Sequence, residues 1–338
     1  SRAPDIARQI EQIVSPGYKS DYTPVEYFEK YIKDMKEGAI LHHSTKQQLT
    51  DGYVTHFNSA MARLKSFVEK KRRGRLSFSD INSEFYNEFV TYLRNDFLDG
   101  KGIRENTIGT TIRRLITVLK KAKKDNFFHG DTEGFIAMKQ DVENIALTET
   151  EIRMIMNADL FGKHHLARER NRFLIAYNFM LRFNDSIRVD EKHIHKDKDR
   201  YFFRMHTQKT KEPVYIPIMP IVYDILKNNG FKVPPISNQK SNDNLKALGK
   251  AAGITGDYTI TEFIKGKRVE TVYKRYELIT THTTRRSAAT NLYLSGMDLE
   301  SIRMFGGWRT LKQLMDYIKI DKLDNARKQV DHPFFNLK

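Results

Sequence analysis

Apolar residues recur every three or four positions through most of the first third of the chain, and this spacing constrains the fold more than any other feature. Between Tyr22 and about Asn126 it occurs in four stretches, each of which places large side chains on one face of a helix. The stripes are Phe28, Tyr31, Ile32 and Met35; Phe57, Met61, Leu64, Phe67 and Val68; Phe85, Phe89, Tyr92 and Leu93; and Ile108, Ile112, Leu115 and Leu119. Four such helices joined by short loops predict a small helical bundle. The fourth helix is expected to begin at a cap formed by Asn106 or Thr107.

The second half of the chain mixes helical and strand patterns. Thr148, followed three residues later by Glu151, has the signature of a capping box and predicts the start of a helix. Alternating apolar residues predict two β-hairpins, one joining 201–205 to 214–218 and one joining 258–264 to 268–273. Further helices are expected at 167–181, 282–295, 298–305 and 310–320. The predicted fold is mainly α with small β-sheets, in two domains.

We expect five parts along the chain. They are a lead-in at 1–20, a helical domain at 21–126, a linker at 127–146, a second domain at 147–321 and a tail at 322–338. The tail has apolar residues at helical spacing and ends near Phe334 and Phe335. Each large apolar side chain gains about 1.5–3 kcal/mol on burial, so the tail is expected to dock on protein.

The chain is strongly basic. It carries 58 lysines and arginines against 42 aspartates and glutamates, a formal net charge of +16. This excess favours a polyanionic partner, above all nucleic acid, because neutralised phosphates release counterions. The alternative is a basic surface without a partner. Two clusters in the helical domain lack compensating acids and are the candidate DNA-binding residues: Lys70, Lys71, Arg72, Arg73 and Arg75, and Arg113, Arg114, Lys120, Lys121, Lys123 and Lys124.

Other classes of chemistry are excluded or disfavoured. The chain has no cysteine, which excludes disulfides, thiolate zinc sites and cysteine nucleophiles. It has neither a glycine-rich phosphate loop nor the His/Glu spacing of a metal site, so no cofactor or metal is expected. No apolar run approaches the roughly 18 residues that a membrane span requires, and we expect an intracellular protein.

An ordered series of polar motifs runs through the second domain. It consists of Leu181-Arg182-Phe183-Asn184-Asp185, Gln208-Lys209-Thr210, His282-Thr283-Thr284-Arg285, Gly306-Gly307-Trp308 and, nine residues later, Tyr317. In residue types, order and spacing the series resembles the tyrosine recombinase family, also called the phage-integrase family. The resemblance covers roughly residues 22–320, and the segment from Ile236 to His282 looks especially like integrases of bacterial mobile elements. It implies a helical, SAM-like core-binding domain followed by an α/β catalytic domain.

The resemblance implies a covalent mechanism. Tyr317 would attack a DNA phosphate and form a 3′-phosphotyrosine that a DNA hydroxyl later displaces. A tyrosine hydroxyl, with a pKa of about 10, is a weak nucleophile at neutral pH, so charge must be stabilised on the phosphate. Arg182 and Arg285 match the two arginines of the family, and a guanidinium is suited to phosphate oxygens. Asp185, one turn after Arg182, would orient that arginine.

The remaining positions would handle protons and hydrogen bonds. Lys209, in the hairpin turn, would protonate the leaving 5′-oxygen, and His282 would accept or donate a proton near the tyrosine. Trp308 stands where a histidine is more common, and its indole N–H can donate a hydrogen bond to phosphate without transferring a proton. Two departures from the family pattern are Met180, where glycine is common, and Arg286, which follows Arg285 and could be confused with it.

These observations predict a site-specific DNA recombinase or integrase that mobilises a genetic element without a cofactor. Its expected partners are double-stranded DNA and three further copies of itself in a synaptic tetramer, at the chromosome in a bacterial cytoplasm. The tail at 322–338 would dock on a neighbouring subunit, and the lead-in at 1–20 would be the remnant of an upstream arm-binding domain. The alternatives are a tyrosine-dependent nicking-closing topoisomerase and a DNA-binding relative without catalytic activity. All six motif positions are filled, which argues against the silent relative.

Overall fold

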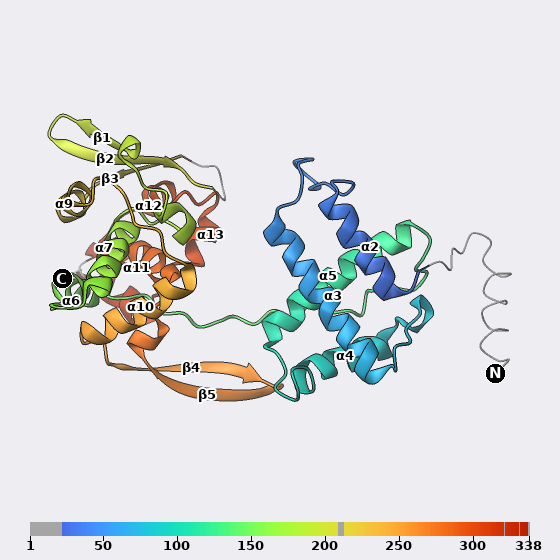
Figure 1. Cartoon of the computed structure of the whole chain (residues 1–338). Coiled ribbons are helices and arrows are strands. Elements are labelled where there is room, and N and C mark those ends of the chain that lie inside the picture. Colours follow the sequence, from blue (N-terminus) through green and yellow to red (C-terminus); the bar gives the residue numbers. More distant parts are fainter. Residues whose placement is uncertain (1–21, 209–212, 321, 331, 337–338) are drawn as a thin grey trace, which may run out of the picture. The chain divides into compact units, whose positions relative to one another are not determined.

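The computed structural model describes residues 22–208, 213–320, 322–330 and 332–336 (Figure 1). It consists of two compact units: Ser1–Val142 with Thr261–Val269, and Glu143–Ile260 with Glu270–Lys338. Lys209 and its three successors therefore lie outside the described residues. Within the described ranges, every helix is too short or too polar to cross a lipid bilayer.

The first unit is the predicted four-helix bundle. Its helices are α2 (Pro24–Lys36), α3 (Asp51–Lys71), α4 (Ser83–Asn95) and α5 (Glu105–Lys124), with a 3₁₀ turn η1 (Phe78–Asp80) before α4. The four apolar stripes face inward and form one core in which Phe57, Phe67, Phe85 and Phe89 have no exposed surface. The periodicity therefore predicted both the helices and the side of each that is buried.

The expected cap of the fourth helix is wrong. Helix α5 begins at Glu105, and its N-cap residue is Arg104, whose side chain makes no capping bond. Asn106 is already inside the helix, where its side chain binds both backbone groups of Gln140, with two bonds of 2.8 Å. An asparagine near a helix start can cap the helix or bind a distant loop, and the sequence does not distinguish the two. Here Asn106 binds the loop at Gln140.

The bundle also extends further along the chain than expected. Phe127, Phe128 and Phe135 are buried in its core, although they fall in the expected linker at 127–146. A Cβ atom on Gly109 would lie 1.8 Å from the carbonyl oxygen of Met138, so α5 and this segment are in close contact. The first unit therefore runs to Val142, and the extended connection is shorter than predicted.

The second unit contains most of the sequence motifs and mixes helices with two small sheets. Its first half comprises α6 (Glu149–Asn157), α7 (His164–Asn178), α8 (Phe183–Ser186), η2 (Glu191–His193), β1 (Ile194–Asp197), β2 (Arg200–His206), β3 (Pro213–Pro217), α9 (Pro220–Asn228) and α10 (Asn238–Ala251). After α10 the chain forms β4 (Asp257–Ile264) and β5 (Lys267–Lys274), of which 261–264 and 267–269 are assigned to the first unit. The second half of the second unit continues with η3 (Arg275–Leu278), α11 (Thr281–Leu294), α12 (Leu299–Gly306), α13 (Leu311–Met315), α14 (Lys322–Lys328) and η4 (Pro333–Asn336). The fold class is therefore confirmed as mainly α with small β-sheets.

Both predicted hairpins are present, and the first belongs to a larger sheet. Strands β1, β2 and β3 form an antiparallel sheet in that order, with Phe203 of β2 opposite Ile194 on one side and Ile216 on the other. The sequence did not predict β1, because its residues after Ile194 are polar and exposed, so apolar alternation is absent. Strands β4 and β5 form a separate two-stranded sheet.

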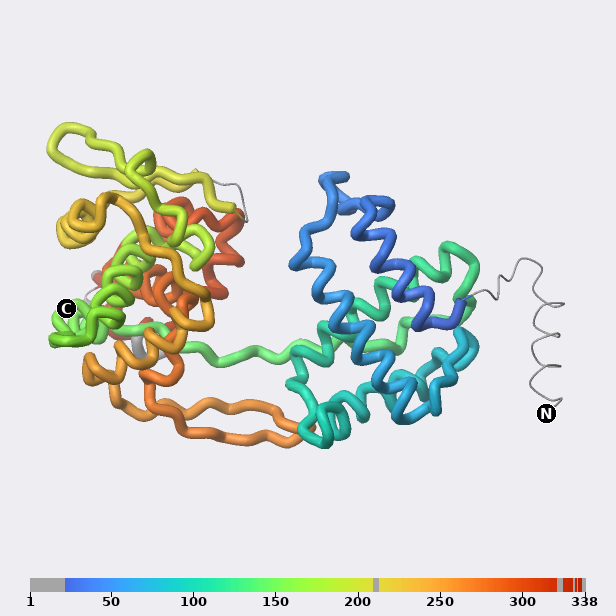
Figure 2. The backbone as a smooth tube through the Cα atoms, in the orientation of Figure 1, coloured from blue at the N-terminus to red at the C-terminus, as the bar shows by residue number. Residues whose placement is uncertain are grey.

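Two apolar clusters support the second unit. The larger contains α7, α10 and the three-stranded sheet, where the rings of Phe179 and Phe203 stack at 3.9 Å. The smaller joins α11, α12 and α13 through Ala289, Ile302 and Leu314. Figure 2 shows this last part of the chain in orange and red. The smaller cluster includes Trp308 and borders Tyr317, so these two predicted catalytic positions lie on a packed scaffold.

Candidate active site

Arg285 lies at the centre of the site. Helix α11 places it one turn after His282, and its side chain is 1% exposed whereas that of His282 faces solvent. Its Nη1 donates to the carbonyl oxygen of Met180, and its Nη2 donates to the carbonyl oxygen of Gly306 at 2.6 Å. Its Nε is buried and has no hydrogen-bond partner among the described residues. Two backbone carbonyls thus fix the guanidinium, and its Nε–H has no partner among the described residues.

The carbonyl of Met180 reaches Arg285 because of an uncommon backbone conformation. Met180 has a φ of 47°, in the left-handed region that favours glycine. The residue ends the chain segment that follows α7, and its own side chain is buried among the residues of the smaller cluster. Met180 thus holds, with a buried side chain, a backbone conformation that glycine adopts at least cost.

The charge of Arg285 lacks full compensation. Burial, followed by the nearby positive charge of Arg182, lowers the pKa of Arg285 to about 9, while Tyr317 and Asp185 raise it in part. Desolvation of a cation disfavours its charged form unless an anion is supplied. Binding of an anion beside Arg285 would therefore stabilise its charged form.

Trp308 forms one wall of the site. It is 2% exposed, its ring lies 3.9 Å from the guanidinium carbon of Arg285, and its Nε1 has no hydrogen-bond partner among the described residues. The two glycines before Trp308 are required for different reasons. A Cβ on Gly306 would lie 1.7 Å from the indole ring, and Gly307 adopts a φ of 60° that ends α12. The Gly-Gly-Trp motif is thus explained by packing of the indole and by the turn before it.

Tyr317 lies beside Trp308 and Arg285. Its ring meets that of Trp308 edge to face at 5.2 Å, and its centroid is 5.3 Å from the guanidinium carbon of Arg285. The helix expected at 310–320 is present but shorter, because α13 ends at Met315 and Tyr317 occupies the turn that follows. The backbone N–H of Lys319 donates to the hydroxyl of Thr290 on α11 at 3.0 Å, which holds the outgoing chain against the site.

Arg182 and Asp185 lie at the start of α8. Arg182 is half-buried, and its Nη1 is buried without a hydrogen-bond partner in the part of the chain described. Asp185, 1% exposed, accepts hydrogen bonds from the backbone N–H of Gln208 at 2.9 Å and from Arg188 at 3.3 Å. Asp185 therefore contacts Arg188 and Gln208, and its predicted role of orienting Arg182 stays a prediction. Gln208 lies two residues after the end of β2 and immediately before Lys209, so Asp185 holds the chain at the position before that lysine.

Arg286, the neighbour that could be confused with Arg285, points to a different part of the unit. It donates to the carbonyl oxygen of Ile145 at 2.7 Å and to the side chain of Asn144 at 3.2 Å. Burial lowers the pKa of its guanidinium. The H-x-x-R spacing therefore selects the arginine that reaches Trp308 and Tyr317, and Arg286 serves the chain segment that enters the unit.

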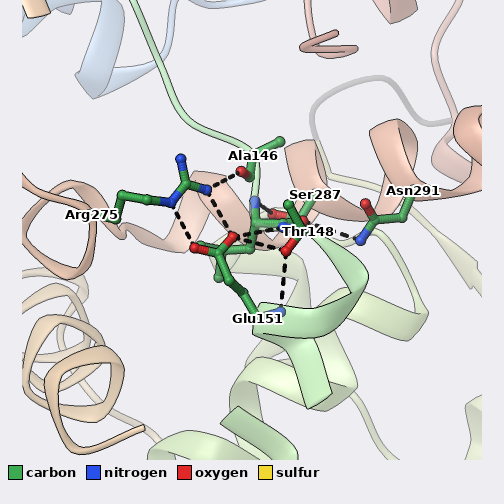
Figure 3. A network of polar contacts seen from close by, with 7 residues as sticks. Ala146, Thr148, Glu151, Arg275, Ser287 and Asn291 are labelled. Atoms are coloured by element: carbon green, nitrogen blue, oxygen red, sulfur yellow. Dashed lines mark hydrogen bonds and ion pairs between the residues drawn. The ribbon is translucent and has the colours of Figure 1, made fainter. Parts of the chain in front are cut away.

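Figure 3 shows how that entering segment is held. The hydroxyl of Ser287 on α11 accepts from the backbone N–H of Leu147 at 2.8 Å, and Asn291 donates to the carbonyl oxygen of the same residue at 3.2 Å. Arg275 binds both carboxylate oxygens of Glu151, at 2.6 and 2.8 Å. Burial alone would raise the pKa of Glu151, but the pairing with Arg275 and the predicted capping box with Thr148 outweigh it. The pKa of Glu151 is therefore lowered. Ser287 and Asn291 thus attach α11 to the start of the second unit.

The predicted basic clusters are more neutralised than expected. Four of their members have acidic partners: Lys70 with Asp99 at 3.2 Å, Lys71 with Asp96 at 2.8 Å, Arg72 with Glu88 at 2.5 Å, and Lys121 with Asp125. The prediction that the clusters lack compensating acids is therefore wrong for these four. Apart from Asp125, the acids lie 16 to 29 positions away along the chain, so the pairing depends on the tertiary fold.

Other members of the clusters differ in environment. Arg114 lies over the ring of Tyr53 at 4.7 Å, and Lys123 donates to the carbonyl oxygen of Gly130 at 3.0 Å. Five side chains are exposed and have no charged partner among the described residues: Arg73, Arg75, Arg113, Lys120 and Lys124. The last three are spaced i, i+7 and i+11 on α5 and therefore share one face of that helix.

Comparisons with known proteins agree with this architecture. The family described as "Phage integrase SAM-like domain" matches residues 23–132, and that described as "Phage integrase family" matches residues 146–323. No curated protein matches the chain in sequence.

Solved structures similar to this chain cover nearly its whole length. The Tn1549 transposon integrase bound to a circular-intermediate DNA has a TM-score of 0.61 and 15% identity, covering 91% of this chain and 99% of that one. The XerH site-specific recombinase bound to a palindromic difH substrate has a TM-score of 0.64 and 13% identity, covering 93% and 99%. A lambda integrase tetramer bound to a Holliday junction has a TM-score of 0.62 and 14% identity, covering 94% and 87%. At these identities the likeness establishes the shared fold.

Proposed function

Because the chain belongs to the phage-integrase family, that of the tyrosine recombinases, we propose that it cuts and rejoins double-stranded DNA at specific sites through a covalent 3′-phosphotyrosine. The oxygen of Tyr317 attacks the phosphorus, the bond from phosphorus to the 5′-oxygen breaks, and the freed 5′-hydroxyl or that of another strand later reverses the step. The reaction conserves the energy of the phosphodiester. We assign it to integration or excision of a bacterial mobile element, at the chromosome.

One observation carries this proposal. Arg182, Arg285 and Trp308 each have a buried N–H donor without a hydrogen-bond partner among the described residues, and Tyr317 lies against two of them. Buried donors are nearly always satisfied in folded proteins, so a group of three predicts a missing acceptor. A phosphate supplies several acceptor oxygens for these donors, and its negative charge would compensate the buried positive charge of Arg285. Preorganised donors of this kind stabilise the charge that develops as Tyr317 attacks.

The proton transfers fall to His282 and Lys209. His282, exposed on the first turn of α11 and one turn before Arg285, takes the role of proton acceptor or donor beside the tyrosine. Lys209 protonates the leaving 5′-oxygen. The backbone N–H of its neighbour Gln208 donates to Asp185, so we propose that Asp185 contributes by holding the chain just before this lysine.

The decisive experiment is covalent trapping. The protein is incubated with a nicked duplex that carries a candidate attachment sequence, so that the strand beyond the break is lost and the covalent complex accumulates. Mass spectrometry should then find DNA on Tyr317. Binding without a covalent complex would favour the catalytically silent relative. Relaxation of supercoiled DNA with no recombinant product would favour the topoisomerase.

We propose that the unpaired cations of α5 bind the DNA backbone. Replacing Arg113, Lys120 and Lys124 with glutamine should reduce the slope of log K against log salt concentration by about 2 to 3, since each neutralised phosphate contributes about 0.9. Fluorescence anisotropy over a salt series measures this slope. The matched control replaces Lys70, Lys71 and Arg72, which already have acidic partners, and should change the slope less. Equal effects of the two triple variants would contradict the assignment.

We also propose that four copies assemble on paired sites and that residues 322–338 contact a neighbouring subunit. Helix α14 meets its own α11 through polar contacts, in which the hydroxyl of Tyr293 donates to Asn325 at 3.4 Å and Lys328 lies over the Tyr293 ring. The apolar residues beyond it, Val330, Phe334 and Phe335, are each more than 60% exposed. Apolar side chains grouped in this way favour contact with another protein surface.

Truncation after Asp321 tests this assignment. The shortened protein should bind a single site with unchanged affinity but should no longer pair two sites or cleave them in a coordinated way. Native gel electrophoresis with one-site and two-site DNA separates the two properties. Recombination at the full rate by the truncated protein would refute the role of the tail.

A further inference from the structure

The first turn of α11 is held both by a capping box of its own and by a different helix. Thr280, its N-cap residue, forms the capping box with Thr283, whose hydroxyl accepts from the backbone N–H of Thr280 at 2.9 Å. The backbone N–H of Thr281 donates to Oδ1 of Asn242 on α10 at 2.9 Å. The hydroxyl of Thr281 donates to Oδ1 of Asn238, also on α10, at 3.0 Å. The N-terminal N–H groups of a helix need acceptors, and α10 provides the one for Thr281.

Helix α10 is itself held by α7. Ser241 donates to Glu169 of α7 at 2.5 Å, and Asn244 donates to the same carboxylate at 3.5 Å. Glu169 is 1% exposed, and burial raises its pKa although Arg172 and these two partners oppose the shift. Leu245 and Leu248 of α10 are buried in the larger core. One polar side of α10 thus connects a buried group on α7 to the beginning of α11.

We propose that Asn242 is a positioning residue for His282, which it serves by fixing the first turn of α11. The inference rests on the proposed function, in which His282 transfers a proton. Asn242 holds the N–H of the residue directly before His282, whereas Arg285, one turn later, is held by the carbonyls of Met180 and Gly306. Loss of the Asn242 acceptor therefore loosens the turn that carries His282 and leaves the anchorage of Arg285 in place.

The separate anchorage predicts a specific kinetic defect. A leucine at position 242 has a similar shape but no acceptor, so Asn242→Leu should slow single-turnover cleavage by about 10- to 100-fold, the range expected when a catalytic group is displaced by about an ångström. DNA affinity should stay within about twofold of the parent protein, because the bonds of Arg285 persist. Asn242→Asp keeps an acceptor oxygen in the same place, so this variant should cleave at a rate much closer to that of the parent protein than Asn242→Leu does.

Two controls separate positioning from general damage. Gln239→Leu changes an exposed residue of the same helix, whose amide donates to Asp243, and should cleave at the parental rate. His282→Gln combined with Asn242→Leu should be no slower than His282→Gln alone, because a displaced histidine and an absent one lose the same contribution. Thermal denaturation verifies that each variant is folded at the assay temperature. Should Asn242→Leu not fold, Asn242→Ala removes the same acceptor without adding an apolar branch.

The outcomes distinguish the inference from the function on which it rests. If His282→Gln slows cleavage but Asn242→Leu does not, the inference is overturned and the proposed function stands. The inference is also overturned if aspartate fails to restore the rate, or if the two substitutions slow cleavage independently. If His282→Gln cleaves at the parental rate, the role assigned to His282 in the proposed function is itself wrong.

Discussion

Tyr317→Phe is expected to abolish covalent attachment of the protein to DNA and to leave its DNA affinity nearly unchanged. The substitution removes the nucleophilic oxygen and keeps the ring that packs edge to face on Trp308. Binding depends mainly on charge, which the substitution does not alter. Denaturing gel electrophoresis of the trapped complex measures attachment, and fluorescence anisotropy measures affinity.

A second tyrosine of the same unit provides the control. The hydroxyl of Tyr293 bonds to Asn325, away from the site, so Tyr293→Phe should form the covalent complex at the parental level. A full yield of covalent complex from Tyr317→Phe would show that another residue is the nucleophile. Loss of attachment in both variants would point to a structural cause.

Arg285→Met should lower the rate of strand cleavage by about 10²–10³, the usual effect of removing one preorganised donor to a charged transition state. Methionine fills much of the same buried space beside Trp308, so the wall of the site is preserved. Arg182→Met should have an effect of the same order, because Nη1 of Arg182 is the other buried guanidinium donor without a partner in the described ranges. Single-turnover cleavage of a nicked duplex, measured at saturating protein, gives these rates.

Arg286→Met is the matched control. Arg286 is adjacent in sequence, buried, and likewise bonded to a backbone carbonyl, but that carbonyl belongs to Ile145. Its replacement should change the cleavage rate per folded molecule far less than replacement of Arg285. If the two methionine variants lose the same rate, the loss reflects a disturbed α11, and the assignment of Arg285 to the phosphate fails.

Much of the fold was predictable because it depends on local patterns. The four stripes of the bundle, the capping box at Thr148 and the two hairpins each follow from residues within a few positions of one another. The choice of Arg285 over Arg286 followed from spacing on one helix, which sets the face that each side chain occupies. The bundle, the capping box and the hairpins are confirmed by the arrangement of the described residues, and the choice of Arg285 stays a prediction.

The rest depended on partners distant in sequence. Lys70 lies on α3 and Asp99 follows α4, so the two come into contact only when these helices pack together. Their ion pair therefore has no local sequence signature. The burial of Phe135 in the bundle, the bonds of Asp185 to Gln208 and the capping of α11 by Asn242 all join different elements. The carbonyls of Met180 and Gly306 are backbone groups, and side-chain motifs say nothing of where they point.

The two consecutive buried arginines of α11 have a consequence for how such a sequence changes over generations. Arg285 and Arg286 are 1% and 9% exposed, and the described residues place no carboxylate in an ion pair with either. Uncompensated buried charge opposes folding, and replacement by apolar residues of similar volume is often neutral or stabilising. Mutation alone therefore favours the loss of Arg285, and only selection for recombination retains it. Under the proposed function, a copy of the gene whose product no longer serves recombination should lose this arginine before the phenylalanine core decays.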